Sequence, residues 1–305
     1  MAFAASGGSA DLTYVVESTY GQTPATPAML YLPINSTTLG LTREQLQSAR
    51  LRADRQIEHV RFGNKSVAGD IDFELSPTDF DSIFAAVLFA PWTANVLTGV
   101  GTTPTTMTLE RRHLDIDQFF VYRGAAVNTL SLTIQPGAIV SGTIGIMARD
   151  AERVAVSLGT PAAMTSREPY DSFTGSMTFN GAPLVDVTSI ELTIDNSLEQ
   201  NWVLFDDRSR EYTARRCNVT GTLVVPFTEA TAAFYDMLTD DIETSLAFTI
   251  GGNGSGMTFE LPRIKITASD VPVPDDGALS LTLPFQCLLD STAGTGTNIR
   301  ITRNV

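Results

Sequence analysis

The sequence predicts a β-rich α+β fold with two similar domains, each a β-sandwich or barrel with one flanking helix. Three observations predict it. Apolar residues alternate with polar ones along many short segments, each half has one amphipathic helical pattern, and the two halves repeat a common pattern. A chain of 305 residues, of which 43% are hydrophobic, is long enough for two cores of ordinary size.

Alternation with period two predicts the strands. Apolar side chains fall on one side of each run and mostly polar ones on the other, as in half-buried strands of antiparallel sheets. The clearest runs are residues 130–134, 190–194, 259–261 and 281–287, and further candidates are 71–75, 140–148, 173–179, 223–227 and 246–250. Turns rich in Gly, Asn, Asp and Pro separate them, as at residues 135–137 and 180–183.

Each half has one predicted helix. In the first, Ser76 is placed to cap the helix and Pro77 to occupy its first turn, and an apolar stripe runs as far as Leu88. In the second, Thr228 is the predicted cap and the stripe ends at Leu238. Each helix is expected to close one side of its sheet.

The repeat is visible in several short matches. Residues 69–75 are echoed by residues 221–227, and Phe84 is followed by Phe234 at a fixed offset (234 − 84 = 150). Met-Thr-Leu-Glu at 107–110 is matched by Met-Thr-Phe-Glu at 257–260 with the same offset. Two copies at this spacing indicate two domains, since a solenoid needs three or more short repeats. The expected division is an N-terminal arm at 1–30, domains at 31–155 and 156–290, and a C-terminal arm at 291–305.

Charge and apolar runs limit the function classes. A formal net charge of −14 argues against a protein that holds nucleic acid on a basic face. It is compatible with DNA that passes without sticking, because an acidic surface repels a polyanion. No run is apolar over the roughly 18 to 20 residues that span a bilayer, and residues 1–10 do not resemble a secretion signal. We therefore expect synthesis in the cytoplasm, with Cys217 and Cys287 as inert core thiols.

Two long polar segments, residues 41–65 and 196–216, precede the repeated glycine strands. Loops of about 20 residues are unusual in a compact domain and suggest binding or assembly. The candidate contact residues between subunits are Arg43, Arg50, Arg52, Arg55, Arg61, Asp206, Asp207 and Arg208. One interpretation is a solvated surface loop. The other is an arm whose basic strip docks on acidic residues of a neighbouring copy, such as Asp240, Asp241, Asp275 and Asp276, in a head-to-tail contact that propagates.

No residue pattern in the sequence indicates a catalytic, cofactor-binding or metal-binding site. The two histidines, His59 and His113, each lie within two residues of an arginine, and no zinc-type spacing or phosphate-binding glycine loop is present. Asp70, Asp72 and Glu74 alternate along one strand and so share one face. They either meet solvent or line an acidic channel, although the second copy lacks these charges.

Several segments carry a resemblance to a known family. They are residues 20–27, 120–134, 136–143 and 170–184. In strand and turn pattern the chain resembles the major tail (tail tube) proteins of long-tailed, non-contractile bacteriophages over roughly residues 14 to 290. The resemblance implies a structural protein without cofactors whose rings stack into a tube for DNA ejection. In that family a ring usually holds six such domains, so a two-domain subunit implies a trimeric, pseudo-hexameric ring.

The resemblance also implies partners and a location. The partners are other copies of the chain, a tape measure protein and tail tip or terminator proteins, with transient passage of DNA and no membrane. The protein is expected in the virion tail after synthesis in the host bacterial cytoplasm. Two other interpretations stay open. One is a different virion assembly or adhesion subunit, such as a capsid decoration or baseplate protein. The other is a carbohydrate-active enzyme, for which Trp92 and Trp202 are the only candidate sugar platforms.

Overall fold

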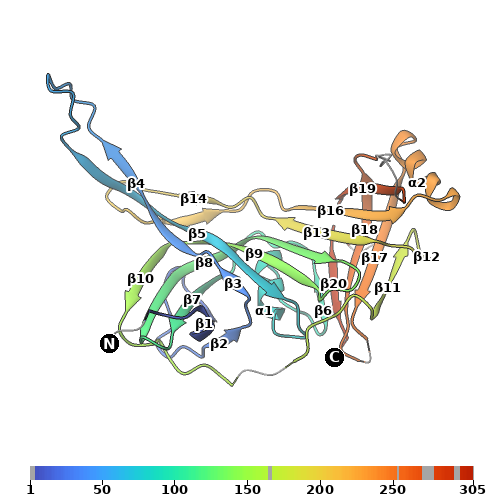
Figure 1. The fold of residues 1–305 in the computed structure, drawn as a ribbon, viewed down its shortest axis with the longest axis horizontal. Helices are drawn as coiled ribbons and strands as arrows, with labels where there is room; N and C mark the ends of the chain where they lie inside the picture. The colour runs from blue at the N-terminus through green and yellow to red at the C-terminus, as the bar shows by residue number, and fades with distance from the viewer. Residues whose placement is uncertain (1–3, 164–166, 253, 270–277, 292–295, 305) are drawn as a thin grey trace.

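The computed structural model of the chain describes residues 4–163, 167–252, 254–269, 278–291 and 296–304. Its first half is built on an antiparallel sheet, which Figure 1 shows on the left. In spatial order the strands are β2 (Leu30–Leu32), β1 (Ala10–Val16), β7 (Thr106–His113), β8 (Gln118–Ile134), β9 (Ser141–Ala148) and β5 (Val60–Glu74). The last position is shared by β3 (Ser36–Thr37) and β4 (Gly40–Gln47), which both pair with β5. A short 3-10 helix, η1 (Gly7–Ser9), precedes β1, and β10 (Asp150–Val154) pairs with the first part of β8.

The second half repeats this order of strands. Its sheet runs β12 (Ala182–Pro183), β11 (Gly175–Phe179), β17 (Glu243–Ile250), β18 (Met257–Ile266), β19 (Ser280–Cys287), β16 (Asn218–Pro226) and β13 (Ser189–Asp195). A two-stranded ribbon, β14 (Glu199–Asn201) and β15 (Glu211–Thr213), extends the β13–β16 hairpin. In the first half, the outer part of the β4–β5 hairpin takes the same position. The prediction of a β-rich α+β fold is confirmed.

The registers of the two halves agree in detail. Glu74 at the end of β5 lies opposite Ser141, and Pro226 at the end of β16 lies opposite Ser280. Each half also has a β-bulge at the same place: the register shifts between Met107 and Leu109 in β7 and between Thr244 and Leu246 in β17. The predicted equivalence of residues 69–75 and 221–227 is therefore a structural one.

The match between residues 107–110 and 257–260 is wrong as a structural correspondence. Residues 107–110 lie in β7, the partner of β8, whereas residues 257–260 lie in β18, the counterpart of β8 itself. Both segments are paired strands in which apolar and polar residues alternate. Two four-residue segments with this pattern can therefore be similar in sequence without occupying equivalent positions in the fold.

The predicted first residue agrees with the structure for the second helix and differs from it for the first. Helix α2 (Glu229–Thr239) begins after Thr228, whose hydroxyl accepts from the Thr231 N–H at 3.2 Å, as predicted. Helix α1 (Asp81–Leu88) begins later than predicted, after Phe80, and has no side-chain cap. Ser76 instead donates to Asp79 at 2.5 Å, and turns occupy the residues between them and the helix.

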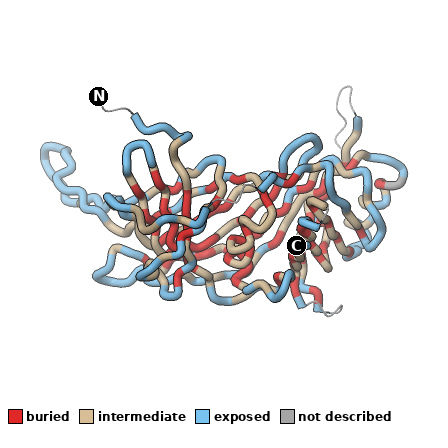
Figure 2. The backbone as a smooth tube through the Cα atoms, turned by 90° about the horizontal axis from the view of Figure 1, so that it is seen from below, coloured by how far each residue is buried: buried red, intermediate tan, exposed pale blue. Residues whose placement is uncertain are grey.

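The halves are joined through their sheets and through their cores. Residues 129–134 of β8 pair with residues 190–195 of β13, so one sheet continues from the first half into the second. Phe84 of α1 and Phe259 of β18 pack edge to face with ring centroids 5.9 Å apart. Figure 2 shows the buried residues along both sheets, with the exposed ones in the hairpins and connections.

Parts of the predicted terminal arms are strands. β1 lies within residues 1–30 and pairs with β7 over its whole length, and its Leu12 is buried. β20 (Arg300–Arg303) lies within residues 291–305 and pairs with both β18 and β6 (Val96–Thr98), so it also joins the halves. Among the described strands no pairing connects β2 to β3 or β4, and the first sheet does not close into a barrel. No described helix has the length and apolar character needed to cross a membrane.

Candidate assembly interface

One continuous polar face extends over both halves. Strands β5, β9, β8, β13, β16 and β19 are neighbours in that order, and where they pair with each other most of their apolar side chains point to the core. The opposite face carries rows of small polar residues that cross the strands. One row is Asp72, Thr143, Ser131, Thr193, Thr220 and Gln286, and the next is Glu74, Ser141, Thr133, Glu191, Thr222 and Pro284. We call this surface the polar face.

The predicted acidic residues Asp70, Asp72 and Glu74 lie on the polar face, on β5. Ser36 and Thr143 donate hydroxyls to Asp72 at 2.7 and 2.8 Å. These donors hold the pKa of the Asp72 carboxyl below its ordinary value. Asn35 donates to Glu74 at 3.4 Å. The structure adds Glu191 on β13, which the sequence analysis did not single out although it alternates with the buried residues of the run 190–194.

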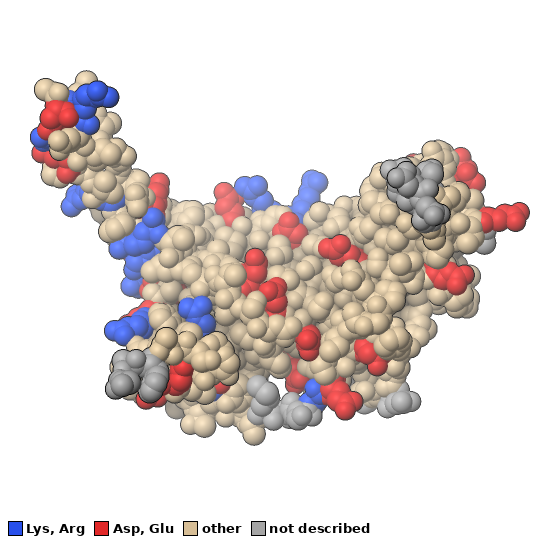
Figure 3. Space-filling model, viewed as in Figure 1, with Lys and Arg blue, Asp and Glu red and all other residues tan. Residues whose placement is uncertain are grey.

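Over these six strands the two rows contain three carboxylates and no lysine or arginine; beyond β19 the first row continues to Lys265 of β18. Because the sheet is continuous, acidic residues from both halves share one surface. In Figure 3 the charged side chains over the middle of the molecule are mainly acidic. Such a surface repels a polyanion and offers it no phosphate contacts.

The first long segment is a hairpin and not a loop. β4 and β5 continue as a ribbon that projects from the body at the upper left of Figure 1. Arg50, Arg52 and Arg55 lie at its tip, where Arg52 pairs with Asp54 at 2.8 Å. Arg61 lies on β5 near the tip, and Arg43 lies near the base. Only part of the predicted basic strip therefore reaches the tip.

The second long segment lies across the first half. Asp207 pairs with Arg43 at 2.8 Å and with Lys65 at 3.5 Å, and Arg208 pairs with Asp150 at 3.1 Å. Asp206 accepts from the Arg208 N–H at 3.0 Å and so shapes the turn. In the single chain, Asp206, Asp207 and Arg208 thus form and stabilise contacts between the two halves. Their predicted role between copies stays a prediction.

The two ends of the molecule differ in charge. Residues 228–242, which include α2, contain four acidic residues and no basic one: Glu229, Asp236, Asp240 and Asp241. Asp241 pairs with Lys265. In Figure 3 basic side chains gather at the β4–β5 end, and the α2 end shows acidic ones. The predicted docking residues Asp275 and Asp276 lie outside the described residues.

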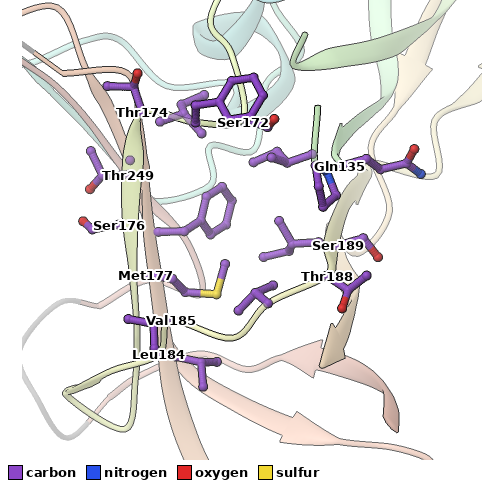
Figure 4. A pocket seen from close by; sticks show the side chains of 18 of the residues that line it. Gln135, Ser172, Thr174, Ser176, Met177, Leu184, Val185, Thr188, Ser189 and Thr249 are labelled. Atoms are coloured by element: carbon purple, nitrogen blue, oxygen red, sulfur yellow. The ribbon is translucent and has the colours of Figure 1, made fainter. Parts of the chain in front are cut away.

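An apolar cavity of about 430 Å³ opens between β11, the end of β8 and the connection from β12 to β13. Met177, Leu184 and Val185 line one part of it (Figure 4). Its one carboxylate, Asp171, accepts from the N–H groups of Phe173 and Thr174, which lower its pKa. Within the described ranges no three His, Cys, Asp or Glu side chains are grouped to hold a metal ion.

A family model described as phage tail tube protein matches residues 7–287. The chain belongs to the phage tail tube protein family. No curated protein matches it significantly. The tail tube protein is therefore a structural component of the phage tail that assembles into a tube in the virion, and the prediction of a tail tube protein is confirmed. The match covers both halves, including the polar face and both hairpins.

Proposed function

We propose that three copies of this tail tube protein close into a ring with pseudo-sixfold symmetry, and that the rings stack into the tube of a long-tailed, non-contractile phage. The observation that carries the proposal is the repeat of strand order and register in the two halves. Each half acts as one of six similar units: the first consists of the predicted range 31–155 together with β1, and the second lies within 156–290. The role is structural and involves no catalysis.

The pairing of β13 with β8, which joins the two halves of one chain, is the model for the pairing between neighbouring chains. β13 lies between β16 and β8, and the Asn196 N–H that follows it donates to Asn128 of β8 at 2.9 Å. The counterpart of β13 in the first half is β3 with β4, which has a described partner only in β5. An unpaired strand edge of this kind is a template for another chain. We propose that the second half of the next copy supplies the strand that fills it, as the first half does for β13 within one chain.

Closure of the ring places the polar face around the channel. Pairing of one copy's edge with the next extends the same sheet, so the polar rows continue around the axis. Its acidic residues, Asp70, Asp72, Glu74 and Glu191, then face the passing DNA and keep it from binding. A tape measure protein during assembly, and tail tip and terminator proteins at the two ends, complete the set of partners. Synthesis takes place in the cytoplasm of the host bacterium.

Replacement of Leu41 by proline tests the edge. Leu41 is the counterpart of Ile194 in β13. The N–H of Asn196 points to β8, and because N–H groups two residues apart along a strand point to the same side, so does that of Ile194. The N–H of Leu41 therefore points to the unpaired edge. Proline removes that donor and is tolerated on an edge strand. We expect the monomer to fold and tube formation to fall roughly tenfold or more, since each ring closes through three such edges and each lost hydrogen bond is worth about 1 kcal/mol.

Negative-stain electron microscopy of nucleated assembly gives the readout, with circular dichroism to verify folding. Leu41→Thr is the matched control, because it changes the same side chain and keeps the N–H. Normal tubes from Leu41→Pro would show that this edge is not the ring junction.

A further inference from the structure

The β14–β15 ribbon is held against the first half of its own chain by a defined set of contacts. Gln200 donates to the Ala148 carbonyl at 3.0 Å, and the Tyr212 hydroxyl donates to the Gly124 carbonyl at 2.8 Å. The hydroxyls of Ser209 and Tyr20 share a hydrogen bond of 2.8 Å. These contacts leave Ser209 and Gln200 only 0% and 5% exposed.

The outer part of the β4–β5 hairpin is the counterpart of that ribbon. Val60 lies nine residues before Gly69, as Tyr212 lies nine before Gly221 (69 − 60 = 221 − 212 = 9). Across the ribbons Val60 is opposite Gln47, and Tyr212 is opposite Gln200. Gln47 and Gln200 therefore occupy equivalent positions in the two ribbons. By the same count Ile57 occupies the position of Ser209.

The β4–β5 hairpin has no comparable support beneath it. Ile57 is 63% exposed and Val60 is 51% exposed, whereas their counterparts are covered by the first half. Figures 1 and 2 show this hairpin projecting from the body with an exposed tip. The β14–β15 ribbon is covered by the first half, whereas the equivalent β4–β5 hairpin is exposed in the single chain. We therefore expect another chain to cover the hairpin.

We propose that the β4–β5 hairpin of one copy lies across the second half of a neighbouring copy, as the β14–β15 ribbon lies across the first half of its own chain. This inference rests on the proposed ring of repeated units and names one of its contacts. The landing site is the end of β19, because β19 corresponds to β9. Cys287 then takes the place of Ala148, and Leu289 that of Asp150.

The side chains at the two surfaces suit each other. In the internal contact, Arg208 on the ribbon meets Asp150 on the first half. At the proposed contact, the position of Asp150 is taken by Leu289, which is 58% exposed in the single chain. The hairpin offers Ile57 and Val60 in place of Ser209 and Tyr212. Polar groups are thus replaced by apolar ones on both sides, and docking removes all three side chains from water.

A different docking site follows from charge alone. The basic tip of the hairpin is complementary to the acidic α2 end, where Asp240 lies. The internal template places the hairpin at Leu289 instead. Cross-linking can separate the two sites.

The experiment uses assembled full-length protein with two introduced cysteines and a short bismaleimide. Ile57→Cys with Leu289→Cys tests the proposed contact, and Ile57→Cys with Asp240→Cys tests docking by charge. Unaltered protein serves as the background control. Burial raises the pKa of Cys217 to about 11 and that of Cys287 to about 12, so the native thiols react slowly at neutral pH.

We expect covalent dimers and trimers from the Leu289 pair in assembled samples, and only monomers from the same pair before assembly. Cross-links from the Asp240 pair alone would overturn the proposal in favour of docking by charge. Rings or tubes without cross-links from the Leu289 pair would overturn the docking site and leave the proposed function intact. Failure of unaltered, nucleated protein to form rings would overturn the proposed function, and the docking with it.

Discussion

Replacement of Glu17 by leucine is expected to destabilise the first half by about 4 kcal/mol or more, a large share of the roughly 5 to 15 kcal/mol by which a domain is usually stable. Glu17 is buried just after β1. Its carboxylate accepts four hydrogen bonds, from the N–H groups of Gly21 and Gly124 and from the hydroxyls of Thr106 and Thr108, all between 2.8 and 2.9 Å. Leucine leaves these donors buried without an acceptor, at about 1 to 3 kcal/mol each.

This loss would also reach the contact between the halves. The turn that Glu17 holds carries Tyr20, whose ring packs edge to face on Tyr212 of β15 with centroids 5.4 Å apart. Urea unfolding followed by circular dichroism measures the effect. Glu17→Gln keeps the shape and one acceptor oxygen and should cost less, and Glu152→Leu on the surface should cost little. A Glu17→Leu variant within 1 kcal/mol of the unaltered protein would contradict this account.

Charge reversal on the polar face is expected to block the passage of DNA while leaving the tube intact. Asp72→Lys with Glu191→Lys places two cations per copy on a surface that has none in its two central rows from β5 to β19. In a trimeric ring these become six, and every ring along the tube repeats them. Contacts of six to ten cations with phosphates change DNA affinity by orders of magnitude, so we expect infectivity to fall about 100-fold or more.

The matched control is Asp72→Asn with Glu191→Gln, which removes the same charges without adding cations. The Asp72 carboxyl is ionised at neutral pH, since neighbouring hydroxyls lower its pKa further. Complementation of a phage that lacks its tail tube gene, with electron microscopy of the particles, gives both readouts. Normal ejection from lysine-bearing tubes would show that the polar face does not line the channel.

Much of the fold follows from local sequence patterns. The runs 130–134 and 190–194 are strands because their alternation fits a sheet with one buried face, and Thr228 caps α2 because its hydroxyl reaches the free N–H of Thr231. The same alternation placed Asp70, Asp72 and Glu74 on one face. These predictions need only neighbouring residues.

Other features depend on contacts that the sequence does not display. Ser76 resembles a cap, but its hydroxyl bonds Asp79, and α1 begins five residues later at Asp81 (81 − 76 = 5). Polar residues 41–65 and 196–216 resembled loops, since alternation is weak where both faces of a ribbon are exposed. Glu191 joins the acidic residues of β5 only because β13 pairs with β8, a pairing between the halves.

A reconstruction of the assembled tube by cryo-electron microscopy tests the central claim most directly. The account predicts three chains per ring with six similar lobes, and the face of β5, β9, β8, β13, β16 and β19 turned toward the axis. Six chains per ring, or this face turned outward, would contradict it.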